Sequence, residues 1–184
     1  MRVAYVTRED CGLGHSVRGL ALVRAGQRSG VEVRAFGPRL EPLDDLLPFA
    51  PDLILGDLSW WRLTEYLDAL DVPGWALFRW VGASWLRGPR LDRWERRISI
   101  EPAADGISGI TDRIAPIIDT EAAFRPEDGQ ELRAGYSTWW ESAWFGYRDR
   151  VRWYTEGSPE RQARIDAGGE MTENGADVLM RMIS

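Results

Sequence analysis

The residue best suited to acid–base chemistry is the only histidine of the chain, His15. It follows a glycine-bearing loop, residues 8–14 (REDCGLG), which joins a β-rich run to a segment with helical spacing. Histidine titrates near neutrality, so it can take or give a proton at physiological pH. On local grounds a second interpretation stays open, in which His15 caps the helix or belongs to the core.

Asp57 is the second candidate because it ends the apolar run 53–56 (LILG). If that run is a strand parallel to residues 2–7, Asp57 and His15 lie on the same edge of one sheet. A carboxylate there could hold the imidazole tautomer and stabilise the imidazolium. The alternative is that Asp57 caps the helix that begins near Ser59.

Two segments have the composition of an anion site. Glycines 12 and 14 allow the backbone to approach a ligand, and the following helix offers free N–H groups, although the spacing is not the dinucleotide GxGxxG pattern. The chain contains no Lys, so Arg and helix N-termini must supply any anion binding. Residues 135–141 (GYSTWWE) could cradle a phosphate and bind a ribose hydroxyl, or simply begin an N-capped helix; the candidate ligands are Gly12, Gly14, Gly135, Ser137, Thr138 and Glu141.

Ten tryptophans are present, and most are expected to pack in the core or in an oligomer interface. Trp60 and Trp61 follow Asp57 directly, so we expect this pair nearest to a ligand.

The elements that must position these residues alternate between strand and helix patterns. Such alternation predicts a doubly wound α/β domain with a parallel sheet over residues 1–120. We expect strands at 2–7, 31–36, 51–56, 75–81 and 97–100, with helices from His15 to Gly30 and from Ser59 to Leu70. Residues 121–184 predict a shorter, α-rich second segment, closed by a helix that Thr172 caps.

Composition excludes several classes of protein. The net charge is −6, with +1 in residues 1–100 and −7 in residues 101–184, which argues against a basic nucleic-acid module. One Cys and one His exclude a disulfide framework and His-rich or all-Cys metal sites, so no metal is expected. No apolar run is long enough for a transmembrane segment, and the early charges exclude a signal peptide, so we expect a cytoplasmic protein.

Four segments together resemble a glycosyltransferase of the two-domain GT-B kind, the group of the UDP-glycosyltransferases and the lipid II-forming GlcNAc transferase. They are residues 11–18 (CGLGHSVR), 51–61 (PDLILGDLSWW), 134–146 (AGYSTWWESAWFG) and 168–183. The resemblance implies a Rossmann-like N-terminal domain and a compact inverting enzyme that moves a sugar from a nucleotide-diphosphate sugar to an acceptor hydroxyl. His15 would be the base and Asp57 its partner. The donor would bind to Gly135, Ser137, Thr138 and Glu141, with Arg18 offsetting leaving-group charge; no further cofactor is implied.

The second segment is shorter than the family's second domain, and this motivates alternatives. A homodimer could complete the cleft. The chain could instead be a non-catalytic relative that binds a nucleotide, a sugar or a regulatory partner. A third alternative is a DNA-base glycosyltransferase that uses the Arg-rich residues 79–97. The negative net charge of the chain argues against this alternative. The sugar, the nucleotide and the acceptor are not specified by these patterns.

Overall fold

The computed structural model describes residues 1–7, 13–57, 60–78, 91–100, 109–114, 117 and 174–184. The strands in these ranges are β1 (Arg2–Val6), β2 (Glu32–Phe36), β3 (Leu53–Asp57), β4 (Gly74–Phe78), β5 (Arg96–Ser99) and β6 (Asp112–Arg113). The helices are α1 (Leu13–Ser29), α2 (Leu46–Phe49), α3 (Trp60–Leu70) and α7 (Gly175–Ile183), with 3-10 turns η1 (Leu43–Asp45) and η3 (Leu91–Arg93).

All six described strands form one sheet, in which every neighbouring pair is parallel. Their order is β2-β1-β3-β4-β5-β6, so the chain reverses its direction of travel across the sheet between β1 and β3. An α/β fold with a parallel, Rossmann-like sheet, as predicted from the sequence, is confirmed. In open sheets of this kind, ligands bind outside the carboxyl ends of the strands where the direction reverses.

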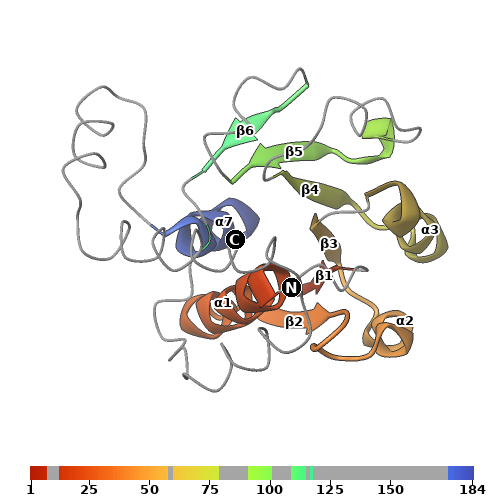
Figure 1. The fold of residues 1–184 in the computed structure, drawn as a ribbon, viewed down its shortest axis with the longest axis horizontal. Helices are drawn as coiled ribbons and strands as arrows, with labels where there is room; N and C mark the ends of the chain where they lie inside the picture. The colour runs from red at the N-terminus through yellow and green to blue at the C-terminus, as the bar shows by residue number, and fades with distance from the viewer. Residues whose placement is uncertain (8–12, 58–59, 79–90, 101–108, 115–116, 118–173) are drawn as a thin grey trace, which may run out of the picture.

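Helices cover both faces of the sheet (Figure 1). Helices α1 and α7 lie side by side on one face, over Val3, Leu55 and Ile98 among other buried residues. On the other face, α2 and α3 lie over a second buried cluster that includes Ile54 and Trp94. Because successive side chains of a strand point to opposite faces, the apolar runs of the central strands supply both cores at once.

The described helix ends follow local sequence signals, with one correction. Helix α1 ends at Ser29, and Gly30, where the sequence predicted the helix to stop, follows in the left-handed region at φ 74°. The predicted cap at Thr172 is wrong for α7, because the helix begins at Gly175. Asn174 Oδ1 accepts a hydrogen bond from the Ala176 N–H at 2.9 Å and is the cap.

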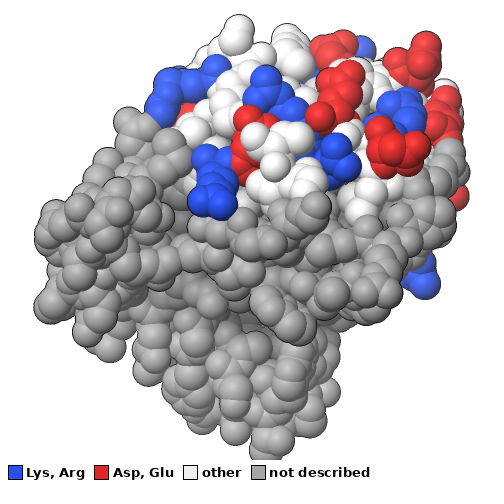
Figure 2. Space-filling model, turned by 90° about the horizontal axis from the view of Figure 1, so that it is seen from above, with Lys and Arg blue, Asp and Glu red and all other residues white. Residues whose placement is uncertain are grey.

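The described surface carries mixed charge. On the face seen in Figure 2, Arg side chains alternate with Asp and Glu, and the described part of that face has no extended patch of one sign. Among the described helices, none has the length and apolar character needed to cross a membrane.

Candidate active site

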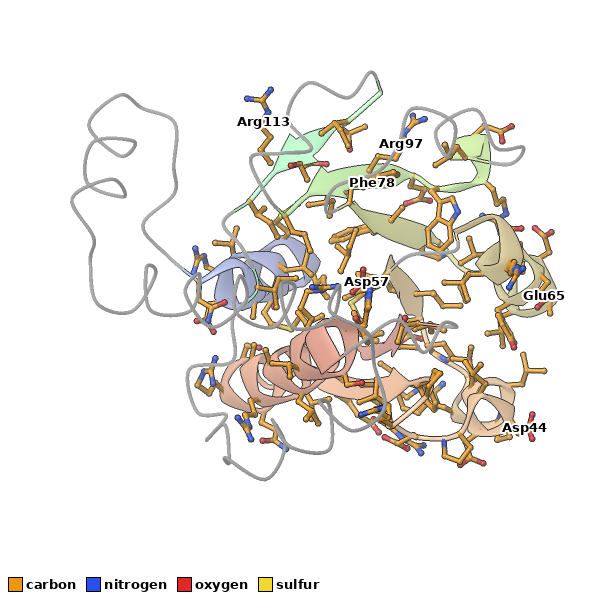
Figure 3. The ribbon with its side chains drawn as sticks, viewed as in Figure 1. Asp44, Asp57, Glu65, Phe78, Arg97 and Arg113 are labelled. Atoms are coloured by element: carbon orange, nitrogen blue, oxygen red, sulfur yellow. The ribbon has the colours of Figure 1, made fainter. Side chains whose placement is uncertain are left out.

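The carboxyl ends of β1 and β3 meet at the position where the sheet reverses direction. In their register Tyr5 pairs with Leu55 and Val6 with Gly56, and Asp57 is the last residue of β3. Leu53 and Leu55 face α1, so strand alternation places Asp57 on that same face. Figure 3 shows Asp57 between β3 and the beginning of α1.

His15 and Asp57 are brought together at this edge. His15 lies in the first turn of α1 and is 7% exposed, and Asp57 is 1% exposed. The distance from His15 Nδ1 to Asp57 Oδ2 is 3.0 Å. The pair therefore has the separation of a hydrogen bond and is almost completely shielded from water.

Arg18 belongs to the same cluster. It lies three residues after His15 and so on the same side of α1. Its Nε donates to Asp57 Oδ2 at 2.8 Å, and its Nη2 lies 2.8 Å from His15 Nδ1. Arg18 is only 3% exposed, so in this structure its guanidinium is directed to the buried pair and not to the protein surface.

Tyr5 completes the cluster and was missed from the sequence. Its hydroxyl lies 2.5 Å from Asp57 Oδ2 and 2.8 Å from the His15 carbonyl oxygen. Gly19 of α1 makes room for the ring, because a Cβ at that position would lie 2.9 Å from Tyr5 Cδ1. The available signal was alternation in β1, which places Tyr5 on the same face as Val3 and next to Leu55.

The charges of the cluster stabilise Asp57 as an anion. Burial by itself would raise the pKa of Asp57, but the Arg18 charge outweighs that effect, and a protonated His15 lowers this pKa further. The net result holds this pKa far below its usual 3.8. Burial, followed by the negative charge of Asp57, raises the pKa of Tyr5 well above 10.0, so the phenol keeps its proton.

Thr7 adds a buried hydroxyl at the same edge. It directly follows β1, is 1% exposed, and its Oγ1 has no hydrogen-bond partner in the described structure. Buried polar groups nearly always have a partner, which is another protein group, water or a ligand. A water, a ligand or a residue outside the description would satisfy this hydroxyl.

Of the other predicted ligands, the description includes Gly14 and the backbone of Trp60 and Trp61. Gly14 lies in the first turn of α1. Trp60 and Trp61 begin α3, but their side chains are outside the description. The other predicted donor ligands lie outside the described residues: Gly12, Gly135, Ser137, Thr138 and Glu141.

The fold and the cluster define an α/β protein with a buried His–Asp–Arg–Tyr network at the reversal point of a parallel sheet. Within the described ranges, no group of three or more His, Cys, Asp or Glu residues is placed to hold a metal ion. Comparisons of the chain with known protein families, with curated proteins and with solved structures found no match.

Proposed function

We propose that the protein is a compact inverting glycosyltransferase of the GT-B kind. It would move a sugar from a nucleotide-diphosphate sugar to an acceptor hydroxyl. The observation that carries the proposal is the buried contact of 3.0 Å between His15 Nδ1 and Asp57 Oδ2 at the carboxyl edge of the sheet. An imidazole with a fixed carboxylate partner is the usual arrangement for removing a proton from a hydroxyl.

The reaction is a single displacement. His15 accepts the hydroxyl proton at Nε2 while the hydroxyl oxygen forms a bond to the anomeric carbon. The bond from that carbon to the diphosphate oxygen breaks, and the nucleoside diphosphate leaves with the electron pair. Asp57 stabilises the imidazolium that results, because its anion faces Nδ1. One displacement at the anomeric carbon inverts its configuration.

The donor must be held by groups that bind phosphate without Lys. The N-terminus of α1 follows the glycine loop and offers free N–H groups to an anion. Thr7, which directly follows β1, adds a buried hydroxyl at the carboxyl edge of the sheet. We assign nucleotide and ribose binding to Gly135, Ser137, Thr138 and Glu141, and acceptor contact to Trp60 and Trp61.

The test is transfer with purified full-length protein. UDP- and dTDP-sugars are supplied with a panel of sugar, lipid and DNA acceptors, and NMR follows release of the nucleoside diphosphate and the configuration of the new bond. We expect a product of inverted configuration. A product of retained configuration, or no product with any acceptor, contradicts the proposal.

The base assignment has its own variant. His15→Ala should abolish transfer while calorimetry still detects binding of the nucleotide sugar. Asp52→Asn, an exposed acid that contacts the Arg2 N–H at 2.6 Å, is the matched control and should leave transfer unchanged. Full transfer by His15→Ala contradicts the role of His15. Nucleotide-sugar binding by the wild type with no turnover would instead favour a binding protein.

A further inference from the structure

The Nδ1 atom of His15 has two neighbours with opposite requirements. Arg18 Nη2, at 2.8 Å, can only donate a hydrogen bond, whereas Asp57 Oδ2, at 3.0 Å, can only accept one. A neutral imidazole carries one ring proton, which lies on either Nδ1 or Nε2. Nδ1 therefore satisfies one neighbour or the other, never both.

The acceptor Asp57 Oδ2 already has two donors besides His15. The Tyr5 hydroxyl lies at 2.5 Å and Arg18 Nε at 2.8 Å, and a carboxylate oxygen has two lone pairs. Asp57 thus gains little from a third donor. Its negative charge is also already countered by the adjacent guanidinium.

The hydrogen bond from Arg18 to Nδ1 outweighs a hydrogen bond from Nδ1 to Asp57. The guanidinium stays protonated in proteins, so Nη2 always carries N–H groups and can only donate hydrogen bonds. A proton on Nδ1 would set two N–H groups against each other at 2.8 Å. Both side chains are more than nine-tenths buried, so water cannot take up the unsatisfied group.

We propose that Arg18 is a positioning residue that keeps His15, in the free protein, as the neutral tautomer with its proton on Nε2. Nδ1 then accepts from Arg18 Nη2, and the free edge of the ring offers an N–H donor to a ligand oxygen. Asp57 favours the other tautomer, in which Nδ1–H donates to Oδ2. Arg18 therefore favours the ring proton on Nε2, whereas Asp57 favours it on Nδ1.

The tautomer follows from the contacts alone, and only its consequence for catalysis rests on the proposed function. A base that accepts a proton at Nε2 needs the Nδ1–H tautomer. The two forms interconvert when Nε2 gives a proton to solvent and Nδ1 takes one, so no charge is gained or lost. Arg18 thus keeps the free protein in the form that cannot accept a proton at Nε2.

The single histidine makes the experiment direct, because ring 15N labelling gives two nitrogen signals only. A long-range 1H–15N correlation spectrum identifies Nδ1 and Nε2 from their couplings to the ring protons, and a protonated nitrogen is well separated from an unprotonated one. The spectrum is recorded without substrate, at a series of pH values above the imidazole titration. We expect a protonated Nε2 and an unprotonated Nδ1. A protonated Nδ1 in the wild type overturns the inference.

Variants test whether Arg18 is the cause. Arg18→Met removes both donors and keeps an aliphatic chain, so the proton should move to Nδ1 and donate to Asp57. Arg28→Met is the matched control on the same helix, because Arg28 is half exposed and pairs with Asp177; its spectrum should equal the wild type. An Arg18→Met spectrum that keeps the wild-type pattern also overturns the inference.

The wild-type spectrum decides the question even where Arg18→Met fails to fold. Arg18→Lys gives a second variant that keeps the charge. A single ammonium cannot reproduce the two-pronged contact with Asp57 and Nδ1, so the proton should shift part of the way toward Nδ1. Because no substrate is used, a chain without transferase activity can still show the expected tautomer. An active enzyme with Nδ1–H contradicts this inference alone.

Discussion

Asp57→Asn removes the charge of a buried ion pair while nearly preserving the size of the side chain. Asp57 is 1% and Arg18 3% exposed, and Nε to Oδ2 is 2.8 Å. The variant therefore leaves a buried guanidinium without its anion. Breaking a buried pair on one side costs about 3–5 kcal/mol. At roughly 2–4 °C per kcal/mol for a chain of this size, the melting temperature should fall by roughly 6–20 °C.

The assay is equilibrium unfolding in urea, followed by tryptophan fluorescence. Asp177→Asn is the control, because its pair with Arg28 at 2.8 Å is exposed and should contribute about 0–1 kcal/mol. The double variant Asp57→Asn with Arg18→Met should lose less stability than the two single changes added together, since both members of the ion pair are then removed. If Asp57→Asn loses no more stability than Asp177→Asn, the ion-pair reasoning is refuted.

Three further outcomes follow from described contacts. The folded pKa of Asp57 lies below its unfolded value, so its contribution to stability is present above about pH 4 and is lost as the pH falls. Between about pH 5 and pH 3 the wild type should lose about 1 kcal/mol more in urea unfolding than Asp57→Asn, and equal losses would contradict this. Gly56→Ala would place a Cβ 2.4 Å from Trp94 Cη2 and should destabilise the protein by about 1–3 kcal/mol in the same assay; an unchanged urea midpoint would show that the indole can move. Asn174→Ala removes the α7 cap, at a cost of about 1 kcal/mol, and should speed amide hydrogen exchange in the first turn of that helix; unchanged exchange would contradict the cap.

The first half of the fold could be predicted because its patterns are strong. The strand at 2–6 and the helix at 13–29 differ from the expected bounds by one or two residues. Asp57 was identified because it ends an apolar run, and its place at one edge with His15 follows from parallel strands. Two short elements were not foreseen. Helix α2 has four residues, with Pro48 among them, and β6 has two, so neither carries a readable period.

The roles of Tyr5 and Arg18 in the site were harder to predict than those of His15 and Asp57. Tyr5 stands in an apolar run, where an aromatic residue looks like core, and nothing local indicates that its hydroxyl meets a carboxylate. Arg18 was assigned to a diphosphate because a sequence gives the charge of a side chain without its partner. Its burial against Asp57 depends on the approach of α1 to β3, which is a tertiary property.

The position of α7 has a consequence for how the chain folds. This helix is the last element described, yet it packs beside α1, the first helix, and over Ile98 and Ile114 of the sheet. Contacts between such distant segments require closure of a long loop and slow the search for the native state. During synthesis, α7 can pack on that part of the sheet only after residues 175–183 have left the ribosome. Helix α7 thus adds its share of the apolar layer beside α1 only after the described strands have been made.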